Sequence, residues 1–327
     1  MIAVGCLVQW YEIDMVEEYL DSLVKSIGNQ KDKVLIDLCL VTNQDLEKMS
    51  RNFLREKFLT NDVTPMYYIR EKFSKICTKI LNKGYQLDMR AEQNLYTIAD
   101  YRRDFNEHYC EKVDILFWGE SDMLVPSQAI ETMLSLHETV KEQTPKYLGF
   151  FSTCKMWDDS WKPLEHPKLT DLPRDAHAWY GTRCYMGYDK MEEINSETES
   201  PHIESTYDYK FNGCGLVMSS ELVRSGVNIP KCVFFTHEDT ALMNKMLTLF
   251  GNNQIPLYIV KNILLVHNRE HPKKRLYVQD EVGDDINEQR KSNNWYKVAS
   301  EMSKLNAYNF MKQGRNFNWK DVWEKVQ

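Results

Sequence analysis

Short apolar runs alternate with amphipathic segments along the first half of the chain, and this alternation constrains the fold more than any other feature. Residues 2–8 and 34–41 have the length and composition of buried strands. Between them, apolar residues at helical spacing run up to Gly28, which predicts a helix with a glycine C-cap. Strands separated by helices in this way predict a mostly parallel α/β sheet.

The same pattern continues further along the chain. Residues 64–82 predict a second helix that ends before Gly84, and residues 113–118 predict a buried strand that is broken by Gly119. Another helix is expected to begin near Pro126. In such sheets ligands bind beyond the carboxyl ends of the strands, so those ends are where functional residues are sought.

The second half of the chain is less regular. Residues 155–210 lose any period and are rich in aromatic residues, proline and acidic residues, which predicts a long functional loop region. Regular patterns return at residues 211–268. The aromatic tail from about residue 293 to the end is expected to be helical.

Composition excludes several classes of protein. The chain has 327 residues, 43% of them hydrophobic, and a net charge of −7, which fits a globular protein and argues against a large nucleic-acid-coating surface. The eight cysteines form no C-x-x-C pair, so they are interpreted as reduced core residues. No apolar run is long enough for a membrane span. A cytoplasmic location is expected.

The segment FWGESDMLVP contains the strongest chemical signal. An apolar strand ends there and delivers Glu120 and Asp122, with one residue between them. Alternate residues at a strand end can direct two carboxylates at one hard divalent cation such as Mg²⁺ or Mn²⁺. The plain alternative is a solvated acidic turn.

Two further segments carry candidate groups. THED places Glu238 and Asp239 at the start of an amphipathic helix, where they act either as ordinary helix-capping carboxylates or as a general base. LLVHN places His267 at the end of an apolar strand, where it is either a structural residue or a metal ligand.

Taken in order, these segments resemble the motifs of family 2-like glycosyltransferases with the GT-A fold. ESDMLVP is similar to the metal-binding Asp-x-Asp region, THED to the motif with the catalytic base, and LLVHN to the strand that supplies a metal-ligand histidine. FNGCGLVMSSEL at 211–222 is similar to the glycine-containing acceptor-side segment. The likeness covers roughly residues 1–270, and the first acidic position is Glu120 rather than Asp.

The resemblance implies a hexosyl- or pentosyltransferase that moves a sugar from a nucleotide-diphosphate sugar to an acceptor hydroxyl. It implies Mn²⁺ or Mg²⁺ held by Glu120, Asp122 and His267, with Asp239 as general base beside Glu238 and inversion at the anomeric carbon. The residues assigned to the donor nucleotide and its diphosphate are Gln9, Trp10, Thr42, Asn43, Asp45, Arg102, Arg103 and Ser121.

The implied domain organisation follows the same family. Residues 1–275 form the GT-A catalytic domain, with a nucleotide-sugar half at 1–125, an acceptor half at 150–275 and a helical extension at 276–327. The expected acceptor is a saccharide or another hydroxyl compound. A modified DNA base is less favoured because of the acidic net charge. The remaining alternatives are a nucleotidyltransferase and a non-catalytic sugar-binding module.

Overall fold

The computed structural model describes residues 1–42, 65–93, 96–155, 163–164, 166, 185–209, 211–268 and 294–313. The strands are β1 (Ile2–Gln9), β2 (Val34–Thr42), β3 (Gln86–Gln93), β4 (Ile115–Glu120), β5 (Met123–Leu124), β6 (Leu148–Lys155), β7 (Pro163–Leu164), β8 (Ile203–Thr206), β9 (Val217–Ser219) and β10 (Leu257–His267). The helices are α1 (Val16–Ile27), α3 (Pro65–Asn82), α4 (Ile98–Tyr109), α5 (Ala129–Val140), α6 (Tyr188–Asn195), α7 (Ser220–Arg224), α8 (Glu238–Phe250) and α11 (Asn294–Gln313), with 3₁₀ turns at η1 (Trp10–Glu12) and η2 (Lys31–Lys33).

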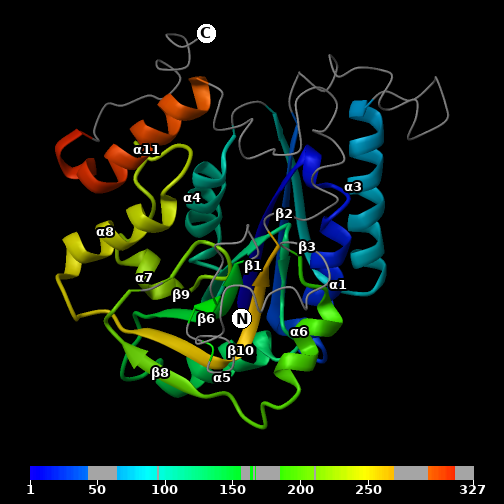
Figure 1. Cartoon of the computed structure of the whole chain (residues 1–327), viewed down its shortest axis with the longest axis horizontal. Coiled ribbons are helices and arrows are strands. Elements are labelled where there is room, and N and C mark those ends of the chain that lie inside the picture. Colours follow the sequence, from blue (N-terminus) through cyan, green and yellow to red (C-terminus); the bar gives the residue numbers. More distant parts are fainter. Residues whose placement is uncertain are drawn as a thin grey trace.

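The described strands join in one mixed, mostly parallel sheet, as expected (Figure 1). Their order is β3-β2-β1-β4-β9-β6-β10-β5, and β7 and β8 pair with β6 and β10. Strands β1 to β4 run parallel to one another, and β10 runs parallel to β6. Because β9 is antiparallel to both β4 and β6, strands β4, β6 and β10 all point the same way. Their carboxyl ends therefore meet at one edge of the sheet.

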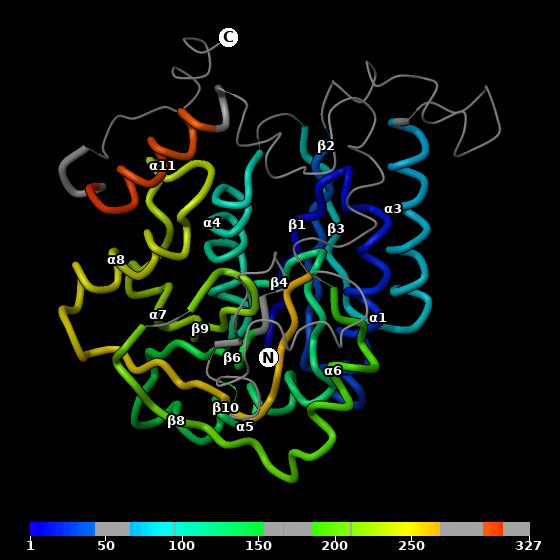
Figure 2. Tube along the Cα trace, viewed as in Figure 1, coloured from blue at the N-terminus to red at the C-terminus, as the bar shows by residue number. Residues whose placement is uncertain are grey.

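Helices cover both faces of this sheet (Figure 2). Helices α1, α3 and α5 pack on one face, where the inward side chains of β1 are Ile2, Val4, Cys6 and Val8. Helices α4, α7 and α8 pack on the opposite face. Burial of apolar side chains on both faces is the usual requirement of a parallel sheet and explains the nearly continuous apolar runs of β1 and β4.

Several elements were missed in the sequence. Strand β3 has the polar sequence QLDMRAEQ because it lies at the edge of the sheet, where one side is open to solvent. Helix α4 was interpreted only as a donor-binding segment. The region 155–210 is not wholly irregular, since its described part contains α6 and β8.

The C-terminal helix α11 lies beside α8 (Figure 1). Ala299 and Ala307 are buried, and Asn244 of α8 donates to the carbonyl of Ala307 at 2.9 Å. The described cysteines are free and buried, as expected: Cys6, Cys39, Cys77, Cys110, Cys214 and Cys232. No helix among the described residues is both long enough and apolar enough to cross a bilayer.

Candidate active site

The two carboxylates Glu120 and Asp122 lie at the carboxyl end of β4, where the chain turns into β5. Asp122 is 6% exposed, and Ser121 between them is 3% exposed. The Ser121 hydroxyl donates to Glu12 Oε2 of η1 at 2.7 Å, which ties this turn to the one that follows β1. Asp122 and Ser121 are therefore buried rather than solvated, whereas the Glu120 side chain is 21% exposed.

His267 reaches the same place from the end of β10. Strand β5 pairs antiparallel with β10, and this register sets His267 opposite Met123, next to Asp122. The backbone N–H of Asn268 also donates to the carbonyl oxygen of Asp122 at 2.8 Å. Long-range strand pairing thus brings together groups that are far apart in the sequence.

The distances from His267 to each of the two carboxylates are those expected between ligands of one divalent cation. His267 Nε2 lies 3.0 Å from Glu120 Oε2 and 3.4 Å from Asp122 Oδ1. Two ligand atoms bonded at about 2.1 Å to one cation are about 3.0 Å apart at a right angle and about 3.4 Å apart at a tetrahedral angle. The donor set of carboxylate oxygen and imidazole nitrogen suits Mn²⁺, Zn²⁺ and related ions.

The charges around these residues also favour a positive charge at this site. Burial opposes the imidazolium, but Cys214, Asp122 and Glu120 raise the pKa of His267 well above its usual value. Burial also opposes ionisation of Glu120, but the charges of His267 and Arg102 lower its pKa to about 2. The site has a negative field that either a proton on His267 or a bound cation compensates.

Arg102 of α4 joins this cluster to the THED segment. Its guanidinium is 1% exposed and donates to Glu120 Oε1 at 2.5 Å, to Glu238 Oε1 and to the carbonyl of Gly213 at 3.0 Å. The guanidinium carbon lies 4.7 Å from the centre of the Trp118 ring. Arg102 therefore positions two carboxylates, whereas the sequence assigned it to the donor diphosphate.

Glu238 and Asp239 begin α8. Burial raises the pKa of Glu238 to about 7, with Arg102 acting against this and Asp239 adding to it. Asp239 is partly exposed, and its Oδ1 accepts the N–H of Thr240 at 2.6 Å, while Oδ2 makes no hydrogen bond to the residues that the structure describes. Asp239 is thus the more exposed of the two carboxylates, whereas Glu238 is buried and paired with Arg102.

Helix α11 supports the start of α8. Ser303 Oγ accepts the N–H of Thr236 at 3.2 Å and donates to the carbonyl of Thr236 at 2.5 Å. The next residue, His237, has φ 64° and ψ 27°, a left-handed conformation that costs free energy and needs support from its surroundings. The C-terminal helix therefore holds the backbone that aims Glu238 and Asp239.

The remaining residues assigned to the donor have varied positions. Gln9 and Trp10 are half-buried at the end of β1, and Thr42 is fully buried at the end of β2. Arg103 pairs with Asp100 and donates to the carbonyls of Pro230 and Val233, so it supports the loop that precedes α8. Asn43 and Asp45 lie outside the described residues.

The sequence interpretation missed Cys214 at this site. Ligand atoms of Glu120, Cys214 and His267 lie within 4.8 Å of one another. Cys214 is in the FNGCGL segment, which had been identified as functional, but it was grouped with the core thiols. The sequence feature that could have identified Cys214 as a site residue is its position between two glycines in that segment.

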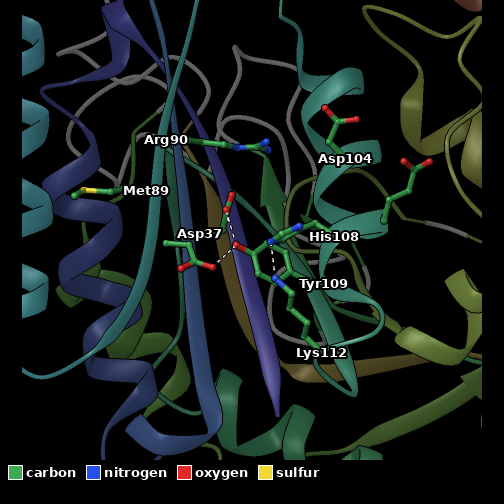
Figure 3. A pocket seen from close by; sticks show the side chains of 9 residues that line it. Asp37, Met89, Arg90, Asp104, His108, Tyr109 and Lys112 are labelled. Carbon is green, nitrogen blue, oxygen red and sulfur yellow. Dashed lines mark hydrogen bonds between the residues drawn. The ribbon is translucent and has the colours of Figure 1, made fainter.

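A separate pocket of about 770 Å³ lies on the α4 side of β2 and β3 (Figure 3). Asp37 of β2 accepts hydrogen bonds from the hydroxyls of Tyr101 at 2.6 Å and Tyr109 at 2.8 Å. Its lining mixes acidic residues with Arg90, His108 and Lys112. Because β2 is two strands away from β4, this pocket is distinct from the carboxylate cluster.

Comparisons with known proteins return solved structures only. No family model and no curated protein sequence matches the chain. S. aureus TarS aligns over 99% of this chain and 47% of TarS, with 10% identity and a TM-score of 0.48. TarS 1–349 in complex with UDP-GlcNAc aligns over 99% of this chain and 79% of its own, with 11% identity and a TM-score of 0.43. The mannosyltransferase PcManGT from Pyrobaculum calidifontis, in complex with GDP-Man and Mn²⁺, aligns over 99% and 78%, with 10% identity and a TM-score of 0.45.

The chain thus spans about half of full-length TarS. With identities of 10–11% and TM-scores below 0.5, these matches are too distant to assign an activity, which has to be argued from the site itself.

Proposed function

We propose that this chain is a metal-dependent glycosyltransferase that moves a sugar from a nucleotide-diphosphate sugar to an acceptor hydroxyl. The observation that carries the proposal is the convergence of Glu120, Asp122 and His267 at the carboxyl edge of the sheet. Arg102 connects this cluster directly to Glu238, the neighbour of Asp239. A cation site and a candidate base are therefore held by one buried network.

The acidic cluster accounts for the donor half of the reaction. Glu120, Asp122 and His267 would hold the cation, which would stabilise the negative charge that develops on the leaving diphosphate. A diphosphate is itself anionic, so it needs a cation to approach two carboxylates. The half-buried Gln9 and Trp10 at the end of β1 lie at the same edge and are proposed to contact the nucleotide.

Asp239 accounts for the acceptor half. Its partly exposed carboxylate would take the proton of the acceptor hydroxyl as that oxygen attacks the anomeric carbon. Glu238 is assigned the supporting role, because it is 8% exposed and its Oε1 accepts from Arg102. A base that acts on the side opposite the leaving diphosphate inverts the anomeric centre, and inversion is part of the proposal.

Two substitutions separate the roles. Asp122→Asn should abolish both transfer and Mn²⁺-dependent binding of nucleoside diphosphates, measured by calorimetry with UDP, GDP and related compounds. Asp239→Asn should abolish transfer while leaving that binding unchanged. Asp32→Asn, on the exposed turn η2, is the matched control and should retain both.

Transfer itself is measured with radiolabelled sugar nucleotides and three acceptor classes: saccharides, proteins and DNA with hydroxylated bases. Full transfer by Asp239→Asn would refute its role as base. If no nucleoside diphosphate binds to the wild-type protein in the presence of Mn²⁺, Co²⁺ or Mg²⁺, the proposed function is wrong.

A further inference from the structure

We propose that Cys214 is a ligand of the same metal site, and that the site consequently prefers a thiophilic transition cation such as Zn²⁺ or Co²⁺ over Mg²⁺. The inference rests on the proposed metal site and adds a residue and a cation class to it. Cys214 is 1% exposed. Its sulfur and the ligand atoms of Glu120 and His267 all lie within 4.8 Å of one another.

The backbone around Cys214 is built to place this residue. Gly215 has φ 80°, a conformation that favours glycine, and its N–H donates to the carbonyl of Trp118 on β4 at 2.9 Å. A Cβ on Gly213 would overlap the guanidinium of Arg102. The Cys214 N–H is fixed by Asn212 Oδ1 at 2.8 Å. Two glycines and two hydrogen bonds thus let the chain pass close to β4 and carry the thiol to the cluster.

Cys214 differs from the other described cysteines in what it faces. Cys6, Cys77 and Cys214 all border the same apolar core, but only the Cys214 sulfur, among the described cysteines, belongs to a group with ligand atoms of Glu120 and His267 within 4.8 Å. Among the residues that the structure describes, Glu120, Cys214 and His267 form the one group of three His, Cys, Asp or Glu ligands close enough to hold a metal ion. A thiol packed only as a core residue has no need of an imidazole and a carboxylate as neighbours.

The ligand chemistry determines the cation. Thiolate and imidazole bonds of about 2.3 and 2.1 Å to one ion separate the two ligand atoms by about 3.6 Å at a tetrahedral angle, which lies within the 4.8 Å limit met by the three ligand atoms. Mg²⁺ prefers oxygen ligands and binds sulfur weakly, whereas Zn²⁺ and Co²⁺ bind sulfur, nitrogen and oxygen ligands together. A site that contains Glu120, His267 and Cys214 therefore selects against Mg²⁺.

Cobalt titration of the 327-residue chain tests this without reference to activity. Co²⁺ bound by a thiolate gives an intense sulfur-to-metal charge-transfer band in the near ultraviolet, in addition to the weaker visible bands of the ion. We expect the wild type to show this band, Zn²⁺ to remove it by displacement, and excess Mg²⁺ to leave it unchanged. Cys214→Ser should lose the band, and its affinity for Co²⁺ should fall by about tenfold or more.

Cys110→Ser is the matched control, since Cys110 is also buried but lies at the C-terminal end of α4, and it should keep the band. Circular dichroism checks the folding of each variant, and the wild-type spectrum is informative even if Cys214→Ser does not fold. Co²⁺ bound in an Asp122-dependent manner without the band overturns the role of Cys214 but leaves the proposed function intact. Absence of both Co²⁺ binding and metal-dependent nucleotide binding overturns both proposals.

Discussion

Removal of the Arg102 side chain should destabilise the protein more than any loss of a surface charge. In Arg102→Met, the carboxylates of Glu120 and Glu238, which are 21% and 11% exposed, lose the guanidinium that lies between them. Breaking a buried ion pair costs about 3–5 kcal/mol, because a charge stays buried without a partner. Glu238 can relieve part of this by taking a proton, so we expect a loss of about 3 kcal/mol.

This loss is measured by urea unfolding at neutral pH, and it corresponds to a fall in Tm of about 6–12 °C at about 2–4 °C per kcal/mol. A divalent cation at about 100 times its Kd should restore about 2.7 kcal/mol, since it supplies positive charge to Glu120. Lys75→Met removes a lysine that is 73% exposed in its pair with Glu71, and should cost less than about 1 kcal/mol. If Arg102→Met unfolds within about 1 kcal/mol of the wild type, the guanidinium does not hold this network together.

Three further expectations follow from the same contacts. Burial raises the pKa of Glu238 from 4.5 to about 7, so between these pH values the folded protein holds a proton that the unfolded chain has lost. The free energy of unfolding should therefore fall by up to about 3 kcal/mol as pH rises from 4.5 through 7. Glu238→Gln should flatten this part of the profile of unfolding free energy against pH. Ser303→Ala removes two hydrogen bonds to the backbone of Thr236, so kcat should drop while nucleotide affinity stays the same. An equal change in kcat and in nucleotide affinity would contradict a role of Ser303 in positioning α8. Asp37→Ala removes a carboxylate that accepts from two buried tyrosine hydroxyls, of which Tyr109 keeps Asp88 as a second acceptor. It should cost about 1–3 kcal/mol in denaturant unfolding with nucleotide binding intact, and reduced binding would instead link that pocket to the donor site.

The sequence predicted those elements whose pattern is local. Strand β1, helix α1 and its cap at Gly28, strand β2 and helix α3 were found because apolar period and terminating residues are both visible within about a dozen residues. Strand β3 was missed because an edge strand with polar residues on both sides has no such period. Helix α4 was missed because its buried face includes Arg102, Arg103 and Asn106, which conceal its amphipathic character.

The sequence alone also indicated the chemistry of single positions. Glu120, Asp122 and His267 could be selected because each follows an apolar strand, and strand ends are where a parallel sheet presents its ligands. The sequence did not show whether Glu238 or Asp239 of the THED segment is paired with another side chain. That depends on the direction in which α8 leaves the loop.

Only the tertiary structure decided how these groups meet. Arg102 bonds to Glu120, 18 residues away, and to Glu238, 136 residues away, and so changes from an expected diphosphate contact to the link between two halves of the site. Cys214 changes from a core thiol to a neighbour of His267 in the same way. Both results depend on how distant segments pack across the whole sheet, and apart from the glycines on either side of Cys214 the local sequence does not show which groups will meet.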